Sequence, residues 1–270
     1  MNGNIQSIAH QDAKRMHAHL KDRFLSLRCF FRLSSFHSSR FNGSEGTVRK
    51  PSPNTKWTMK DPVSGLTHLV GALASIVGTI LLLREAERCG TPWKVGSFGV
   101  FGVSLFLLYA ASAGYHLLDL SERANSRLRT FDHMMIYVLI AGTYTPVCLV
   151  ALSGMLRWIL FVIIWGCALA GILTQGLWFN APRWLSTSYY VVMGWLGILA
   201  IDPLWKAIGT KGIVWMLSGG LFYTIGGVIY AWKVPRTPWK GFGFHEIFHL
   251  FVLCGSFCHY WMVLVYISAV

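Results

Sequence analysis

The stretch Val95–Leu118, VGSFGVFGVSLFLLYAASAGYHLL, contains no Asp, Glu, Lys or Arg. An α-helix of this length rises about 1.5 Å per residue and covers about 36 Å. A membrane-spanning helix needs about 20 largely apolar residues to cross roughly 30 Å of hydrocarbon with its backbone hydrogen bonds satisfied internally. The stretch therefore predicts a transmembrane helix.

The rest of the chain has the same character. Of its 270 residues, 54% are hydrophobic and 13% are charged, against roughly 25% charged in a soluble domain. Seven segments are long and apolar enough to span a bilayer: Ser64–Leu83, Val95–Leu118, Phe131–Leu152, Trp158–Trp178, Leu185–Ile201, Gly212–Trp232 and His245–Ser268. The connections between them are short and polar. The expected fold is an all-α integral membrane protein, with residues 61–270 forming one seven-helix bundle.

The distribution of Lys and Arg predicts the orientation of this bundle. With the spans as placed, the side of the amino terminus carries 18 basic residues and the other side carries six. Because basic residues are retained on the cytosolic side, we expect a cytosolic amino terminus and an extracytoplasmic carboxyl terminus.

Residues 1–60 form a basic, Ser-rich arm with 11 Lys or Arg and three acids. The arm has no apolar run long enough for a signal-peptide core. Three interpretations remain: an interfacial helix on anionic lipid, an organelle transit peptide, or a disordered tail. The arm and the orientation bias account for the net charge of +13 without a nucleic-acid partner. The six cysteines show no CxxC spacing and predict no disulfide framework.

Ionisable residues inside membrane helices are costly and are candidates for function. The predicted spans contain two acids and six histidines: Asp132, Glu246, His68, His116, His133, His245, His249 and His259. The expected topology brings one end of the second, third and seventh spans to the same, cytosolic, depth. His116, Asp132 with His133, and His245 with His249 lie at those ends. The i, i+4 spacing places His245 and His249 on one helix face.

Three neutral imidazoles with one open position match the ligand set of a catalytic zinc ion. We therefore predict His116, His245 and His249 as Zn²⁺ ligands, and Asp132 as the base that holds the metal-bound water. Residues 245–249 also match HExxH, but no third ligand follows closely enough for that motif's usual site. Glu246 is then an edge residue or a group that supports a ligand. His133 points about 100° away from Asp132, and we interpret it, with His68 and His259, as a packing residue.

The same residues carry a family resemblance. Ser112-Ala-Gly-Tyr-His116, Phe131-Asp132-His133 with Ile140-Ala-Gly-Thr-Tyr-Thr-Pro146, and His245-Glu-Ile-Phe-His249 resemble the hemolysin III family of the seven-transmembrane progestin and adiponectin receptor-like superfamily. The resemblance covers the chain from about Asp61 onward. It implies that the three histidines bind zinc, that Asp132 holds a zinc water, that Ser112 lies near the metal, and that the amino terminus is cytosolic. His68 matches a histidine of the family's first helix.

Three functions fit these features. The first is a zinc-dependent hydrolase of a membrane lipid, either an amide of ceramide type or an ester, with Asp132 and Ser112 as catalytic residues. The second is a non-enzymatic sensor of membrane state in which zinc is structural. The third is a pore-forming cytolysin, as the family name suggests. The partner in each case is membrane lipid, and the expected location is a bacterial plasma membrane, or an organelle membrane in a eukaryote.

Overall fold

The structure, a computed structural model, describes residues 59–88, 91–178, 182–235 and 242–270. These residues are helical and contain no strand. Residues 1–58 of the predicted arm lie outside the described residues. The helices are α2 (Pro62–Arg88), α3 (Pro92–Leu117), α4 (Glu122–Pro146), η1 (Val147–Ala151), α5 (Gly154–Leu177), α6 (Arg183–Trp195), η2 (Leu196–Ala200), α7 (Ile201–Trp232), α8 (Phe244–Trp261) and η3 (Met262–Ile267).

Six helical runs within the described residues are long and apolar enough to cross a membrane. Five of them correspond to one predicted span each. The sixth, Arg183–Trp232, has 50 residues and contains two predicted spans. A straight helix of that length would extend about 75 Å, more than twice the hydrocarbon thickness. The all-α membrane architecture is confirmed, whereas the count of seven spans and the orientation of the termini stay predictions.

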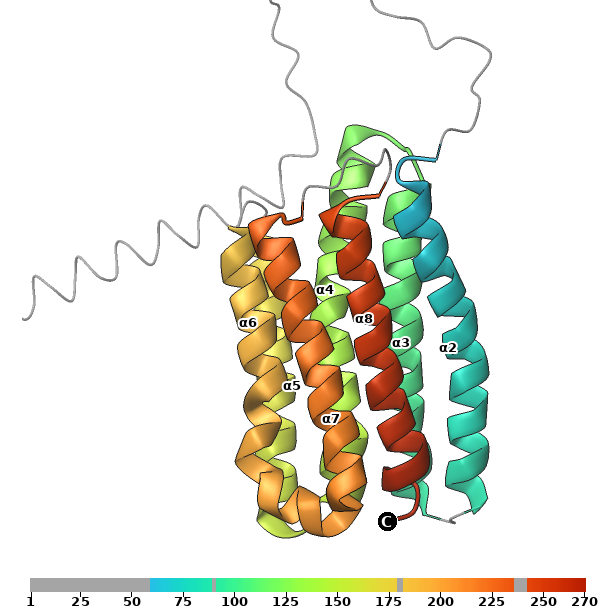
Figure 1. Cartoon of the computed structure of the whole chain (residues 1–270), viewed down its shortest axis with the longest axis vertical. Coiled ribbons are helices and arrows are strands. Elements are labelled where there is room, and N and C mark those ends of the chain that lie inside the picture. The colour runs from blue at the N-terminus through green and yellow to red at the C-terminus, as the bar shows by residue number, and fades with distance from the viewer. Residues whose placement is uncertain (1–58, 89–90, 179–181, 236–241) are drawn as a thin grey trace, which may run out of the picture. The chain divides into compact units, whose positions relative to one another are not determined.

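The Arg183–Trp232 run is not straight. The 3₁₀ segment Leu196–Ala200 interrupts it, and Gly209 within α7 has a φ of 65° and a ψ of 177°, outside the helical region. Glycine adopts this left-handed φ without the steric cost that a Cβ would impose. Figure 1 shows α6 and the later part of α7 running side by side after this break.

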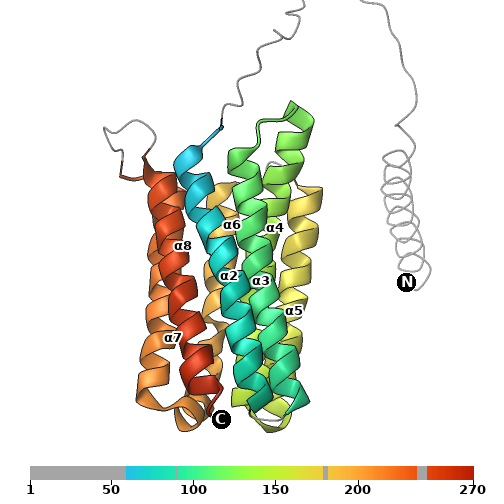
Figure 2. The ribbon, with the colours of Figure 1, turned by 90° about the vertical axis from the view of Figure 1, so that its right-hand side faces the viewer.

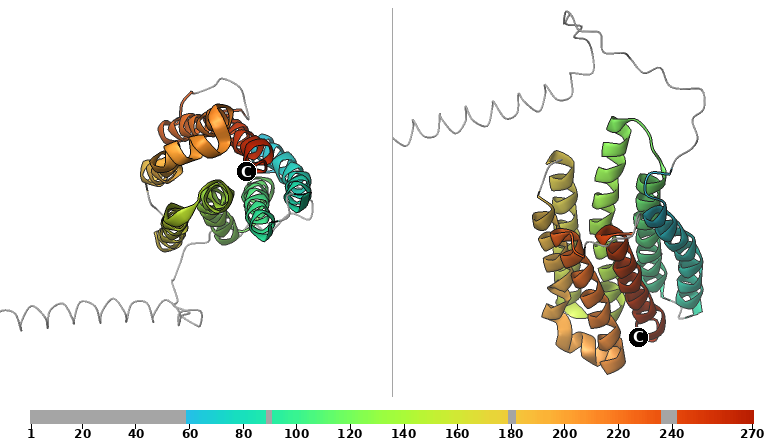
Figure 3. Two further views of the ribbon diagram at one scale, coloured as in Figure 1. Left: turned by 90° about the horizontal axis from the view of Figure 1, so that it is seen from below. Right: turned by 45° about the horizontal axis from the view of Figure 1, so that its top comes forward.

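The helices form a ring in which chain neighbours pack together and α8 returns to contact α2 (Figures 2 and 3). The Tyr260 hydroxyl of α8 donates a hydrogen bond to the Gly78 carbonyl of α2 at 3.1 Å. The ring also brings the end of α3 beside the start of α8, and the starts of α2, α4 and α6 lie at this same end. We call it the histidine end.

The outer surface of the ring is apolar. Val70 of α2 and Val162 of α5 are 66% and 65% exposed, and many other large apolar side chains are exposed on these helices. On α3, Val103 is 52% exposed, whereas Phe98 and Phe101 on its inner side are completely buried. A continuous apolar surface of this extent belongs in hydrocarbon, because a water-soluble monomer rarely exposes an apolar patch above a few hundred Å².

Local sequence signals set several helix ends. Pro92 occupies the first turn of α3, where its missing N–H costs nothing. Ser121 caps α4 by accepting a hydrogen bond from the Ala124 N–H. Pro146 ends the regular hydrogen bonding of α4, and the π-helical segment Val147–Ala151 follows it. Of these signals, the Ser121 cap fixes the start of α4 at the histidine end, whereas Pro92 and Pro146 act at the opposite end of the bundle.

Close packing between α3 and α4 provides a test of this fold. A Cβ on Gly142 of α4 would overlap the side chain of Ser104 on α3, whereas a Cβ on Gly166 of α5 would enter open space. We expect Gly142→Ala to lower the free energy of unfolding by about 1–3 kcal/mol through overpacking. Gly166→Ala should be neutral or stabilising by up to about 1 kcal/mol. Denaturation of the purified protein in detergent measures both, and equal effects would contradict the observed α3–α4 packing.

Candidate metal centre

Two helices supply the three predicted zinc ligands at the histidine end. His116 lies in the last turn of α3 and is 2% exposed. His245 lies in the first turn of α8, and His249 follows one turn later, also 2% exposed. Because residues four apart share a helix face, both imidazoles of α8 turn toward α3.

The three rings form a compact cluster. The Nε2 atoms of His116 and His245 are 3.2 Å apart. The ring centroid of His249 lies 4.9 Å from that of His116 and 4.6 Å from that of His245. One ligand atom from each ring lies within 4.8 Å of the others. Zinc–nitrogen bonds of about 2.0–2.1 Å place tetrahedral ligand nitrogens about 3.3 Å apart, so a small contraction of this cluster would accommodate a metal ion.

The structure adds a residue that the sequence analysis missed. Asp61, immediately before α2, places its Oδ2 atom 3.1 Å from Nδ1 of His116, and its backbone N–H donates to the His116 carbonyl at 2.9 Å. A carboxylate that accepts a hydrogen bond from one imidazole nitrogen fixes the tautomer and directs the other nitrogen at the metal. The sequence did offer a signal for this role: Asp61 is an acid directly before the first apolar segment, at the predicted depth of His116.

Glu246, the glutamate of the HExxH string, has a different task. Its Oε2 atom accepts a hydrogen bond from the Gly243 N–H at 2.7 Å, which caps the start of α8. Its Oε1 atom accepts a hydrogen bond from the Ser64 hydroxyl of α2 at 2.8 Å. Both carboxylate oxygens are therefore occupied in holding α8 to its own start and to α2. This arrangement supports the interpretation of Glu246 as an edge residue.

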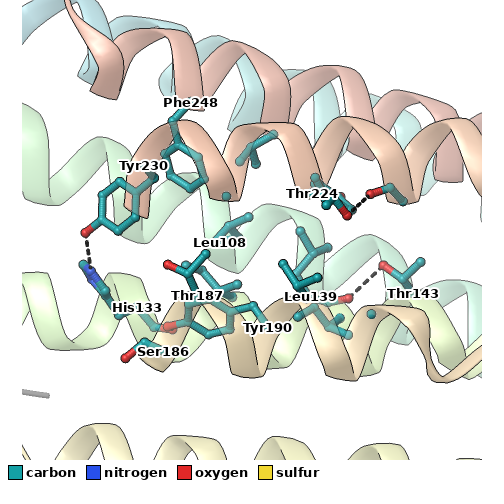
Figure 4. A pocket seen from close by; sticks show the side chains of 18 of the residues that line it. Leu108, His133, Leu139, Thr143, Ser186, Thr187, Tyr190, Thr224, Tyr230 and Phe248 are labelled. Atoms are coloured by element: carbon teal, nitrogen blue, oxygen red, sulfur yellow. Dashed lines mark hydrogen bonds between the residues drawn. The ribbon is translucent and has the colours of Figure 1, made fainter. Parts of the chain in front are cut away.

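A cavity of about 250 Å³ opens beside the histidines inside the ring. His245 and His249 line it, and so do Asp132 and Ser112. Figure 4 shows His133, Tyr230 and Ser186 at one end of this cavity and Thr143 and Thr224 toward the other. Apolar side chains make up much of the inner lining: Leu139, Ile140, Val147, Ile198, Met216, Leu217 and Met262. Both predicted catalytic residues and two of the three predicted ligands, His245 and His249, thus line one chamber.

Asp132 and its neighbour His133 both line this chamber. The Asp132 carboxylate interacts with the Ser112 hydroxyl of α3, and it lies 3.8 Å from Nδ1 of His133. The His133 ring also contacts the Arg129 carbonyl at 2.8 Å and the Tyr230 hydroxyl at 3.3 Å. His133 is therefore held by packing and hydrogen bonds, and Asp132 is the carboxylate that α4 contributes to the lining of the chamber.

Two other histidines among the described residues, His68 and His259, are also buried. His68 of α2 stacks on His249, with ring centroids 3.8 Å apart and planes at 16°. His259 of α8 stacks on Tyr223 at 5.5 Å, two to three turns away from His249 along the helix. Both line the cavity, but neither belongs to the group whose ligand atoms meet.

Comparison with known proteins decides the family. Residues 56–260 match the family model described as "Haemolysin-III related". The chain belongs to the hemolysin III family. It is 39% identical over 211 residues to the "Hemolysin-3 homolog" of Bacillus subtilis, which covers 78% of this chain and 96% of that protein. It is 38% identical over 213 residues to "Hemolysin-3" of Bacillus cereus, covering 79% and 94%.

A more distant relative shows the same resemblance. The human "Monocyte to macrophage differentiation factor" is 27% identical over 212 residues, covering 74% of this chain and 82% of that protein. The predicted family is therefore confirmed. With six membrane-spanning-capable helices among its described residues, this hemolysin III member is an integral multi-pass membrane protein, and its bacterial relatives support a plasma-membrane location.

The Asp61–His116 pair yields a prediction for this centre. Asp61→Asn keeps the size of the side chain but removes the charge that orients His116, and we expect it to weaken metal affinity about 10- to 100-fold. Glu122→Gln removes an exposed acid at the same end and should change nothing. Metal content after equilibration with a graded series of chelator concentrations measures both variants. Equal metal retention in the two would show that Asp61 does not orient a ligand.

Proposed function

We propose that this hemolysin III member is a zinc-dependent hydrolase of a membrane lipid, acting on an amide or ester bond. The observation that carries the proposal is the shared chamber: two of the three clustered histidines, Asp132 and Ser112 all line it. We propose further that the bundle crosses the membrane seven times with a cytosolic amino terminus. The chamber would then open at the cytosolic surface, and the basic arm would lie near anionic lipid.

The residues present fit a zinc ion. The cluster supplies three nitrogen donors within 4.8 Å of one another, and the buried Nδ1 atom of His249 has no hydrogen-bond partner. Imidazole donors suit zinc better than magnesium or calcium, which prefer oxygen. When bound, zinc would supply a Lewis acid and lower the pKa of a coordinated water toward neutrality.

The chain's own residues would then bind the lipid and move the proton. Asp132 would accept a proton from water as the water oxygen bonds to the acyl carbon, and would return it to the leaving nitrogen or oxygen as the carbon–nitrogen or carbon–oxygen bond breaks. The Ser112 hydroxyl would hold the Asp132 carboxylate in position. The apolar inner lining would take an acyl chain and keep bulk water away from the reacting carbonyl.

A second candidate is supported by a different observation. The histidines connect α3 with α8, and Asp61 and His68 add α2 to the same cluster. A metal here would hold three helices together without catalysis, as in a sensor of membrane state with structural zinc. The cytolysin hypothesis has less support, because the charged lining residues gather at the histidine end while the inner lining is largely apolar.

Metal content and lipid hydrolysis, measured on the same samples, separate these candidates. His116→Ala and His249→Ala should lose stoichiometric zinc and all hydrolysis. Asp132→Asn should keep its zinc and lose hydrolysis by about 100-fold or more, since it removes the base alone. Zinc without turnover in the wild type, with unfolding on its removal, would favour the structural role, and no metal in the wild type would refute both.

The HExxH interpretation, in which Glu246 and not Asp132 is the base, predicts a different result for a substitution of Glu246. Glu246→Gln supplies an amide oxygen that can accept the capping hydrogen bond from the Gly243 N–H, and it removes the negative charge. If Glu246 is only a cap, this variant should keep its zinc and its hydrolysis within about threefold, with at most about 1 kcal/mol of lost stability. Loss of hydrolysis in Glu246→Gln with retention in Asp132→Asn would exchange the roles that we assign to these acids.

A further inference from the structure

The cavity has a polar mouth that the proposed chemistry does not use. Five side chains at the histidine end line the cavity there: Ser126, Arg129, Gln175, Arg183 and Ser186. They come from the start of α4, the end of α5 and the start of α6. Three helix ends therefore place two guanidinium groups and three neutral hydrogen-bonding groups around one opening.

Neither arginine at this mouth forms an ion pair with a carboxylate among the described residues, although the charge of Arg129 acts on the Asp132 carboxylate from a longer distance. Within the described parts of the chain, the ion pairs are Arg88–Glu85, His116–Asp61 and His133–Asp132, and neither Arg129 nor Arg183 takes part. The Arg183 guanidinium lies over the Tyr230 ring, 5.4 Å from its centroid, which holds it against the wall of the cavity. An unpaired guanidinium beside an apolar chamber favours an incoming anion, because screening by water is weaker there.

The mouth is close to the metal centre. The Tyr230 ring that carries Arg183 lies 5.8 Å from the ring of His245, and its hydroxyl contacts His133 (Figure 4). A single phenol ring thus separates the Arg183 guanidinium from a candidate zinc ligand. A lipid bound through its headgroup at the arginines would present the first bonds of its acyl chains near the histidines, with the chains in the apolar inner lining.

We propose that Arg129 and Arg183 bind a phosphate-bearing headgroup, so that the lipid taken by this cavity is an anionic phospholipid. The proposal rests on the proposed function in one respect, that the cavity takes a lipid. Phosphate is the anion that suits this mouth, because guanidinium groups bind its oxygens bidentately and its several oxygens can accept from two arginines at once. The neutral groups Ser126, Gln175 and Ser186 offer further donors.

Binding of short-chain lipids to the full chain tests this assignment. The probes are dioctanoyl phosphatidic acid, dioctanoylglycerol of the same chain length, and inorganic phosphate, each titrated calorimetrically in an uncharged detergent. In the wild type, phosphatidic acid should bind at least about tenfold more tightly than dioctanoylglycerol. The double variant Arg129→Gln/Arg183→Gln should lose this preference and keep its affinity for dioctanoylglycerol, which also shows that it is folded.

The matched control is Arg123→Gln/Arg127→Gln, which removes the same charge from exposed positions on α4 that do not line the cavity. If this control lost the preference for phosphatidic acid equally, the effect would come from the surface charge alone, and the proposal would be overturned. So would inorganic phosphate that binds as tightly as phosphatidic acid, or a wild type without preference. His116→Ala separates this proposal from the proposed function, because a variant without zinc or hydrolysis should still prefer phosphatidic acid.

Discussion

Imidazole nitrogens buried at the end of a membrane bundle need partners, and this need organises the structure around it. His116, His245 and His249 lie with their rings 4.6–4.9 Å apart, where unpaired polar atoms would each cost several kcal/mol in hydrocarbon. Asp61 satisfies one nitrogen of His116 and thereby requires α2 to lie beside α3. Glu246 joins α8 to α2 through Ser64. These polar contacts join α3, α2 and α8 at the histidine end, where α8 closes the ring.

The ring in turn creates a chamber whose chemistry changes along its length. The histidine end offers charged and hydrogen-bonding groups, and the inner part offers apolar side chains. A lipid has this same division between headgroup and acyl chain, so the gradient favours a lipid over a water-soluble substrate. The contacts from Arg183 through Tyr230 to His245 connect the arginines of the mouth with the candidate metal centre. Headgroup recognition and bond cleavage would therefore be separate tasks of neighbouring residues.

Glu246 shows why a motif has to be tested against its surroundings. In HExxH sites the glutamate is the base and the two histidines are ligands. Here both histidines lie in the cluster, but each oxygen of Glu246 accepts a hydrogen bond from a group that holds α8 in place. Asp132 on a different helix lines the chamber instead. His245 and His249 share a helix face because they are four residues apart, which is visible in the sequence. Which acid lies beside them depends on how the helices pack together.

The sequence by itself determined that the chain is a bundle of membrane helices and that His116, His245, His249 and Asp132 belong to one end of it. Both follow from the length and order of apolar segments, which are local properties. Only the tertiary structure decided that Asp61 orients His116, that Glu246 is a cap, and that Arg183 packs on Tyr230 at the cavity mouth. The physical reason is that contacts between helices depend on the rotation of each helix about its axis and on its depth. The hydropathy of a segment determines neither its rotation nor its depth, because almost any apolar helix face can lie against lipid.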